Sequence, residues 1–469
     1  MEIETAIKAL LKEVTPVPER EQVSLCCATG RVLAEDVRAP FSVPHFPKSA
    51  MDGYAVRAED VIDATPENPV RLTVVGELLA GDDPASIGRD SSPAAQDDRS
   101  FCHSNAGSDP SPVAQDGIFT CHSEAEAELI RSEDEESPGI RYTAVRIMTG
   151  APVPEGYDAV VKQEDTDYGE TEVSIYHGVS PYMNYCKVGE DIAKGQVVLP
   201  AGRRIGRIEA GVLASLGISE VTVVRPIQVS IFSTGSELIA LFPEKSGCNA
   251  GESDEKSKNG TLTPPVGKIY NSIAYTLSAG IPAAGFTVDF VICPDNTEDI
   301  TRCVEEALKT SDIVITTGGV SVGKRDLLPE VLERIGAKRV FAGVDIQPGT
   351  PTIGSVKDGK VILSLSGNPY AALVNFDLYF WEVIAKLTGC GAFLPERREA
   401  ELDSEYTKVN SHRRLLRAKE ENGKVYLPAK SHASSVLSNL LDCNCYIDLP
   451  AKQQVSMGDR VQIIKMPGA

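Results

Sequence analysis

Acidic side chains stand beside glycine-rich turns at several places in the second half of the chain. Four turns lie at residues 234–237, 294–296, 317–326 and 366–369; all but the second contain glycine, and the first three carry Glu237, Asp295 and Asp326. Glycine lets the backbone approach a ligand closely, and free amides at helix N-termini suit phosphate. Carboxylates beside a phosphate suggest Mg²⁺, which takes a few carboxylates plus ligand oxygens. The pattern predicts a site for an anionic, phosphate-bearing ligand.

Each turn taken alone also has a simpler explanation. A single glycine-rich turn is usually only a turn, and Asp295 could be a helix cap. Glycines that allow close approach of a ligand stand at all but one of these turns, namely Gly235, Gly318, Gly319, Gly323 and Gly367. Convergence of four turns on one sheet edge favours a binding site.

The elements around these turns alternate between strands and helices. Buried strands are predicted near 229–232, 286–292, 313–315 and 361–365, with helices between them and a long helix over 370–386. Asn271 is the predicted cap of one of these helices, which ends near Ala279. Such alternation is typical of a doubly wound parallel sheet. In an open α/β sheet, ligands bind beyond the carboxyl ends of the strands, which is where the four turns lie.

The flanking regions have a different character. A helix is predicted over 3–14 from apolar residues at helical spacing, and short strands with many Gly and Pro follow from about 30 to 223. The tail, 395–467, has short alternating strands, which predict a small β domain. Residues 243–267 read as a loop insertion.

Residues 85–140 read as a second, disordered insertion. They hold 12 acidic residues against three arginines and no sustained periodicity. A duplication brings Cys102-His103 and Cys121-His122 into equivalent places within 90–123. A soft-metal site is one interpretation, but adjacent ligands give poor tetrahedral geometry, so a duplicated linker is favoured.

Bulk properties exclude several classes of protein. With 469 residues the chain should form three or four domains, and its net charge of −21 argues against nucleic-acid binding. It has no apolar run long enough for a membrane span, and its start resembles no signal peptide. Eleven scattered Cys fit free thiols in a reducing compartment, so a cytoplasmic location is expected.

Several further segments complete a resemblance to a known family. In chain order they are 49–55 (SAMDGYA), 147–165, 189–199, 233–238, 270–272 (YNS), 318–323 with Asp326, 348–351 (PGTP) and 365–369. Together they closely resemble the MoeA family of molybdopterin molybdenumtransferases, the molybdenum insertases. One motif would be weak, but the ordered set covers nearly the whole chain apart from the two insertions.

The resemblance implies a multidomain α/β and β fold. Domain I would be elongated and discontinuous, over 1–36 and 187–225, with the mixed domain II inserted at 37–186. Domain III, the doubly wound MoCF-type α/β domain, would cover 226–390, and the β domain IV 395–467. The family also implies a homodimer whose site lies between domain III of one subunit and domain II of its partner.

The implied reaction takes adenylylated molybdopterin and molybdate as substrates, uses Mg²⁺ and releases AMP. The predicted catalytic residues are Asp52, Thr149, Asp191, Glu237, Asp295 and Asp326. Glu237, Asp295 and Asp326 are the predicted metal ligands. The predicted ligand-binding residues are Thr234, Gly235, Ser236, Gly318, Gly319, Ser321, Gly323, Pro348, Gly349, Ser366, Gly367 and Asn368. The predicted partners also include the upstream adenylyltransferase and downstream molybdoenzyme chaperones, with no nucleic acid and no membrane.

The chain departs from the family where positive charge is usual. Lysines common around the Pro-Gly-x-Pro turn are absent, since the turn reads Gln347-Pro348-Gly349-Thr350-Pro351. Arginines usual before Asp191 are replaced by Tyr185, Cys186 and Lys187; Lys187, Lys324 and Arg325 could compensate. Two alternatives therefore stay open: a molybdopterin adenylyltransferase, and a non-catalytic molybdopterin-binding scaffold. The chain's extra domains count against the first, and the lost lysines favour the second.

Overall fold

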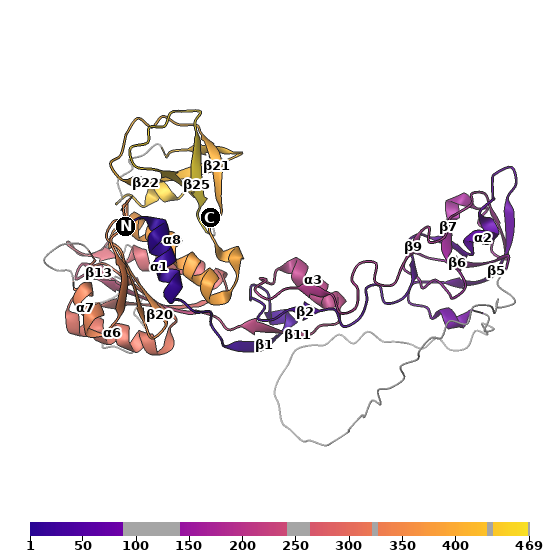
Figure 1. The fold of residues 1–469 in the computed structure, drawn as a ribbon, viewed down its shortest axis with the longest axis horizontal. Coiled ribbons are helices and arrows are strands. Elements are labelled where there is room, and N and C mark those ends of the chain that lie inside the picture. Colours follow the sequence, from indigo (N-terminus) through magenta and orange to yellow (C-terminus); the bar gives the residue numbers. More distant parts are fainter. Residues whose placement is uncertain (88–140, 242–262, 321–326, 429–434, 468–469) are drawn as a thin grey trace, which may run out of the picture. The chain divides into compact units, whose positions relative to one another are not determined.

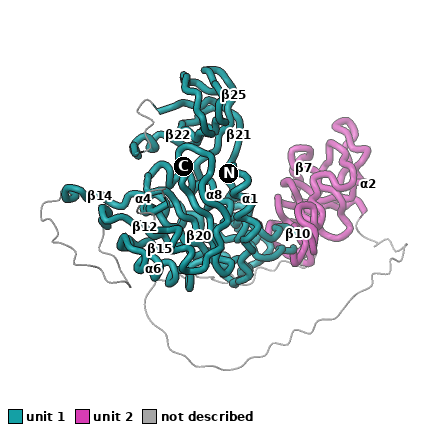
Figure 2. Tube along the Cα trace, turned by 60° about the vertical axis from the view of Figure 1, so that its left-hand side comes forward, with its two compact units in different colours: residues 1–38, 197–469 teal, residues 39–196 magenta. Residues whose placement is uncertain are grey.

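The computed structural model describes residues 1–87, 141–241, 263–320, 327–428 and 435–467. The duplicated Cys-His segment and most of the two predicted insertions lie outside these residues. The described chain divides into two compact units: residues 1–38 with 197–469 form unit 1, and 39–196 form unit 2 (Figure 2). The four-domain division expected from the family stays a prediction.

A six-stranded sheet forms the centre of unit 1. Its order is β15 (Thr287–Cys293), β12 (Gln228–Thr234), β16 (Ile313–Thr317), β20 (Lys360–Leu365), β19 (Ile353–Lys357) and β17 (Lys338–Ala342). The first four strands are parallel, as predicted, whereas β19 and β17 extend the sheet in antiparallel pairing. Ser233, Thr317 and Leu365 share one row, so the carboxyl ends of three strands meet at one edge.

Helices cover both faces of this sheet, as a doubly wound fold requires. One core lies against α1 (Ile3–Glu13), α4 (Ser272–Ser278), α5 (Gly280–Ala283) and α8 (Pro369–Thr388). A second core lies against α6 (Thr297–Thr310) and α7 (Leu328–Arg334). The predicted helices at 3–14, 271–279 and 370–386 are confirmed within a few residues.

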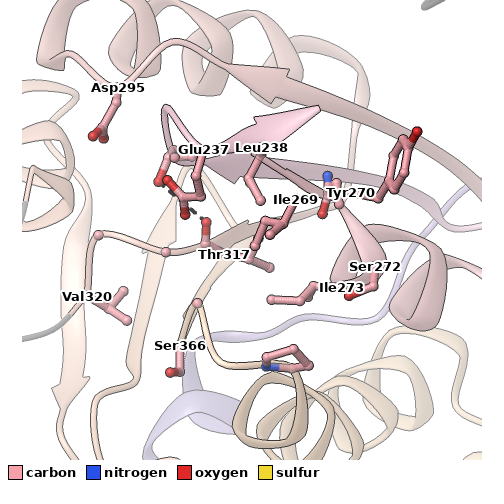
Figure 3. A pocket seen from close by; sticks show the side chains of 17 residues that line it. Glu237, Leu238, Ile269, Tyr270, Ser272, Ile273, Asp295, Thr317, Val320 and Ser366 are labelled. Atoms are coloured by element: carbon pink, nitrogen blue, oxygen red, sulfur yellow. Dashed lines mark hydrogen bonds between the residues drawn. The ribbon is translucent and has the colours of Figure 1, made fainter. Parts of the chain in front are cut away.

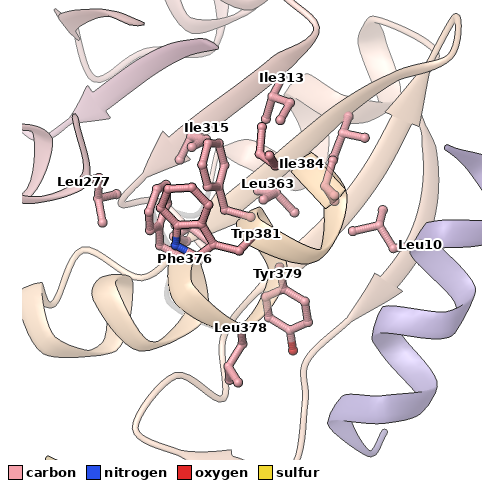
Figure 4. Close-up of a cluster of buried hydrophobic side chains, with 14 of the residues drawn as sticks. Leu10, Leu277, Ile313, Ile315, Leu363, Phe376, Leu378, Tyr379, Trp381 and Ile384 are labelled. Carbon is pink, nitrogen blue, oxygen red and sulfur yellow. The ribbon is translucent and has the colours of Figure 1, made fainter. Parts of the chain in front are cut away.

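The helix α8 is the most buried helix among the described residues of unit 1. Asn368 caps its first turn through its side-chain oxygen, Pro369 stands at the first helical position, and Gly389 ends it at φ +70°. Figure 4 shows Phe376, Trp381 and Ile384 of this helix beside Ile315 and Leu363 of the sheet, with Leu10 of α1 on the flank. This packing holds the turn at 366–369 against the sheet edge.

The C-terminal sheet contains strands in the order β18 (Ile346–Gln347), β22 (Arg413–Glu421), β23 (Lys424–Tyr426), β21 (Arg397–Leu402), β25 (Arg460–Lys465) and β24 (Cys445–Leu449). A further pairing of β22 with β24 closes it around its own apolar core. The β domain predicted for the tail is thereby confirmed. Strand β18 comes from the α/β segment, and it aligns Gln347 with Arg414.

The remainder of unit 1 has small antiparallel pairs. Strand β1 (Arg20–Ser24) pairs with β11 (Glu220–Val224), and β2 (Val37–Arg38) pairs with β10 (Val197–Leu199). Helix α3 (Arg207–Ser215) packs over them through Leu213. The segments joined here lie about 160 to 200 residues apart, so the start of the chain and the stretch after unit 2 form one structure (Figure 1).

Unit 2 holds a five-stranded sheet in the order β7 (Ala159–Lys162), β4 (Gly53–Val56), β6 (Thr143–Ile147), β5 (Val70–Leu78) and β8 (Glu172–Ile175). Helix α2 (Ala58–Val61) and the pair β3 (Lys48–Ser49) with β9 (Tyr185–Cys186) complete it. A side chain at Gly53 would place its Cβ only 1.9 Å from the Val161 carbonyl oxygen. Glycine is therefore required beside Asp52. Within the described residues, no helix is long and apolar enough to cross a membrane.

Candidate functional site

A cavity of about 350 Å³ opens at the carboxyl ends of the parallel strands of unit 1. Eight of the predicted site residues line it: Thr234, Gly235, Glu237, Asp295, Gly318, Gly319, Ser366 and Gly367. Figure 3 shows Asp295 and Glu237 on one side, with Tyr270, Ser272 and Ile273 on the other. The predicted convergence of the four turns on one sheet edge is thus what the fold produces.

The turn after β12 places the Glu237 carboxylate directly over Gly235. A Cβ at Gly235 would lie 2.6 Å from Oε1 and 2.8 Å from Oε2 of Glu237, and the glycine has φ +151°. Lys268 Nζ donates a hydrogen bond to the Ser236 carbonyl oxygen at 2.5 Å and supports the same turn from β14 (Ile269–Tyr270). Glycine at 235 therefore provides the space that the acid occupies.

The turn after β16 presents the backbone of Gly318 and Gly319. Their φ angles are +94° and +64°, and a Cβ at Gly318 would lie 2.8 Å from the Thr234 carbonyl oxygen. A Cβ at Gly367 would lie 3.4 Å from the Gly318 Cα, so the turns after β12, β16 and β20 pack closely. The lack of side chains leaves this backbone open to a ligand.

Asp295 follows β15 and is exposed at the cavity. The cap of α6 is Asn296, whose Oδ1 accepts from the Asp299 amide at 2.9 Å. The simpler interpretation of Asp295 as a helix cap is therefore wrong. Its carboxylate is available to a ligand or a cation.

The motif 270–272 contributes a wall that sequence reasoning left out of the site residues. The further lining residues are Leu238, Ile269, Tyr270, Asn271, Ser272, Ile273, Thr317, Val320 and Pro369. Asn271 caps α4, as predicted, with Oδ1 accepting from the Ala274 amide at 3.2 Å. A capping role alone does not reveal that the same residue faces a cavity. The sequence signal that could have placed Asn271 in the site is its position directly after a short strand, β14, that pairs beside the turn carrying Glu237.

Four predicted ligand-binding residues do not line this cavity: Ser236, Pro348, Gly349 and Asn368. Gly349 packs on Asn375 of α8, whose Nδ2 donates to its carbonyl oxygen at 3.0 Å, and Asn368 caps that helix. Ser321, Gly323 and Asp326 lie outside the described residues, as do Lys324 and Arg325. Their proposed roles stay predictions.

Asp52 and Thr149 form a pair in unit 2. The Thr149 amide and hydroxyl donate to the same carboxylate oxygen of Asp52, at 2.7 and 2.8 Å. The backbone hydrogen bond, with the hydroxyl second, holds the pKa of Asp52 below its usual range. Asp191 also lies in unit 2 and is exposed, with its amide donating to the Val43 carbonyl oxygen. The structure thus pairs Asp52 with Thr149 in unit 2 and brings Glu237 and Asp295 to one cavity in unit 1.

The described lining of the cavity carries no positive charge, and Lys268 stands beside it at the Ser236 carbonyl oxygen. None of the cavity's described lining residues is Lys, Arg or His. At the turn that lacks the family's lysines, Arg414 Nη1 lies 3.4 Å from Gln347 Oε1. In unit 2, Lys187 Nζ lies over the Tyr182 ring, 3.8 Å from its centroid. The described residues form no cluster of three or more His, Cys, Asp or Glu side chains suited to a metal.

The fold and the site by themselves define a class of protein. A doubly wound domain with acids and glycine turns at its strand ends, joined to a small closed β sheet, is a multidomain protein that binds a small anionic ligand.

Three family models match nearly all of the chain. They are the MoeA N-terminal region (domain I and II) over 1–217, the "probable molybdopterin binding domain" over 230–386, and the MoeA C-terminal region (domain IV) over 399–466. The chain belongs to the MoeA family.

Individual relatives agree with this assignment. A molybdopterin molybdenumtransferase of Staphylococcus epidermidis is 32% identical, covering 96% of this chain and 91% of the relative. The molybdopterin molybdenumtransferase of Bacillus subtilis is 31% identical, covering 97% of this chain and 95% of the relative. The solved structure of the molybdopterin biosynthesis MoeA protein from Pyrococcus horikoshii matches with a TM-score of 0.72 and 26% identity over 99% of both chains. The expected family and its multidomain architecture are confirmed.

Proposed function

We propose that this chain is a molybdopterin molybdenumtransferase, which acts on adenylylated molybdopterin and molybdate and releases AMP. The observation that carries the proposal is the cavity at the strand ends. There the carboxylates of Glu237 and Asp295 share a wall with the open backbone of Gly318 and Gly319. Relatives of about 30% identity over nearly their whole length, named for this activity, support it.

The residues of the cavity suit a Mg²⁺–pyrophosphate group. Mg²⁺ is bound through one or two carboxylates, with substrate phosphates and water completing its shell, so Glu237 and Asp295 fit as its protein ligands. When bound, the ion would neutralise charge on the pyrophosphate. The backbone amide of Gly319 would orient the phosphates while water attacks the phosphoanhydride bond and AMP leaves. The Gly318 amide already donates to the Leu365 carbonyl oxygen at 3.1 Å. Asp326 is proposed as a third acid beside the Mg²⁺–pyrophosphate group.

Asp52, Thr149 and Asp191 form the second part of the proposal. We assign them to the same reaction in a homodimer, in which unit 2 of one subunit would serve the partner's cavity. Mixing Asp52→Asn and Glu237→Gln subunits tests this assignment. Activity should return in the mixed dimer if the two acids act from different subunits, and it should stay absent if they act within one.

A cytoplasmic location, and contacts with an adenylyltransferase and molybdoenzyme chaperones, belong to the same proposal.

The scaffold alternative has one specific observation in its favour, which is the absence of cations from the described lining of the cavity. A non-catalytic protein could bind the pterin there without turning it over.

One experiment separates the candidate functions. The protein is incubated with adenylylated molybdopterin, Mg²⁺ and molybdate, and AMP and pterin-bound molybdenum are followed. Molybdate-dependent AMP release supports insertion; ATP consumption with pterin adenylylation supports an adenylyltransferase; binding without turnover supports a scaffold. Tungstate in place of molybdate tests the choice of metal.

Two isosteric variants connect the activity to the cavity. Glu237→Gln and Asp295→Asn should each lower AMP release by at least about 100-fold, as losses of electrostatic catalytic groups usually do. Asp358→Asn is the matched control, because Asp358 is an exposed acid with φ +52°, a conformation that Asn accepts readily. Equal activity of all three variants would remove the cavity acids from the mechanism.

A further inference from the structure

One polar group in the cavity wall lacks a partner among the described residues. Asn271 is only 2% exposed, it lines the cavity, and its Nδ2 donates no hydrogen bond. Less than 1 Å² of this nitrogen is exposed. A buried donor without a partner is costly, and native proteins keep few of them. The arrangement therefore calls for a functional explanation.

The orientation of this amide is determined by its other atom. Oδ1 accepts from the Ala274 amide at 3.2 Å and from Ser233 Oγ at 3.3 Å, and Ser233 Oγ accepts in turn from Thr317 Oγ1 at 2.9 Å. Because a backbone N–H can only donate, the amide cannot be flipped. The chain of bonds runs across β16, β12 and α4, so Nδ2 is held rigidly as a donor.

The surroundings of Asn271 select the kind of acceptor. This side of the cavity carries Leu238, Ile269, Tyr270 and Ile273, which suit a flat heterocycle, together with the small polar Ser272. Figure 3 shows Asp295 on the opposite side. The pyrophosphate is assigned to the glycine turn and to the Mg²⁺ that Glu237 and Asp295 would hold, so Asn271 is left to another part of the ligand. A neutral donor in a largely apolar wall fits a neutral carbonyl oxygen.

We propose that Asn271 Nδ2 donates a hydrogen bond to the lactam carbonyl oxygen of the pterin ring and thereby selects the heterocycle. The identity of the ring as a pterin rests on the proposed function. The nitrogen has already lost its water in the free protein, so the bond to the ligand carries no further desolvation cost on the protein side. Asn271 is then a specificity residue, while Ser233 and Thr317 are positioning residues that act through it.

Binding of simple probes tests this assignment in the full-length protein. Asn271→Ser and Asn271→Asp both keep a side-chain oxygen that can cap α4, and both remove the amide donor Nδ2; the serine hydroxyl is a donor on a shorter side chain. Calorimetry with 6-hydroxymethylpterin should show about ten- to hundred-fold weaker binding in both variants. Binding of AMP, and of pyrophosphate with Mg²⁺, should stay within about two-fold of wild type in Asn271→Ser. Ser233→Ala, which keeps the donor but frees the amide, should lose less pterin affinity than Asn271→Ser.

The outcomes decide the assignment. Unchanged pterin affinity in both Asn271 variants overturns it, and so does a loss confined to pyrophosphate. Circular dichroism checks folding, and the serine variant carries the test if the aspartate variant does not fold. Failure of the proposed function has a different signature: the wild type binds the pterin in an Asn271-dependent manner but releases no AMP.

Discussion

Replacement of Gly235 by alanine should move the Glu237 carboxylate while leaving the fold intact. The new Cβ would stand 2.6 Å from Glu237 Oε1, and ordinary contact begins near 3.4 Å, so the carboxylate has to shift by about 0.8 Å. The clashing atoms are the far end of a flexible side chain, which can move at little energetic cost. The change therefore acts on the position of one acid.

The expected loss of activity follows from that displacement. A misplacement of about 1 Å can reduce a rate by about 100-fold, so we expect AMP release to fall by about 10- to 100-fold in Gly235→Ala. Backbone strain at φ +151° should also lower the free energy of unfolding by about 1–3 kcal/mol. The assay measures molybdate-dependent AMP release at saturating substrate, alongside urea denaturation.

A second glycine provides the control for strain. Gly458 has φ +91° and no heavy atom within 4 Å of a built Cβ, so Gly458→Ala carries the strain without the clash. It should lose stability but retain activity. Full activity of a folded Gly235→Ala protein would show that the position of the Glu237 carboxylate does not matter to the reaction.

Three further predictions concern pH and stability. Burial raises the pKa of Asp377 to about 7, although Tyr446 donates a hydrogen bond to it at 2.6 Å. Folding therefore favours the neutral acid. The stabilisation that the neutral Asp377 provides is present near pH 4 and is lost as the pH rises through 7. The free energy of unfolding of wild type relative to Asp377→Asn should therefore fall by about 4 kcal/mol between pH 4 and 8 in urea titrations, and a flat difference would contradict this. Thr149→Val removes one of two donors to Asp52, so the carboxyl pKa measured by NMR should rise part of the way to its usual value; no change would exclude the hydroxyl as a cause. Leu363→Ala in the central sheet, where the side chain is fully buried, should cost about 2–5 kcal/mol in denaturant unfolding, and a loss below 1 kcal/mol would contradict the packing.

The positions of the main elements of the α/β domain could be predicted because their signals are local. Apolar spacing located the strands that become β12, β16 and β20 and the helices α1 and α8, each within a few residues of its observed limits. The antiparallel strands β17 and β19 were not predicted, since pairing partners and strand direction depend on contacts between distant segments.

Part of the candidate site could also be predicted from the sequence. Acids beside glycine turns are visible in the sequence, and the carboxyl-end rule for α/β sheets brings Glu237 and Asp295 to one edge. The rule does not say which nearby residue faces the cavity. It therefore missed Asn271, which lines the cavity. Gly349, which the family resemblance implied, does not line this cavity, and its carbonyl oxygen accepts from Asn375 Nδ2.

By itself the sequence determined the order of motifs and the family they belong to, and it pointed to the acids proposed for the reaction, because these are properties of residue type and spacing. Only the tertiary structure decided how the atoms are used. It placed the Glu237 carboxylate over Gly235, made Asn296 and not Asp295 the cap of α6, and held the Asn271 amide by Ser233 from another strand. Each of these depends on atoms brought together by long-range packing, and no local pattern in the chain encodes their distance or direction.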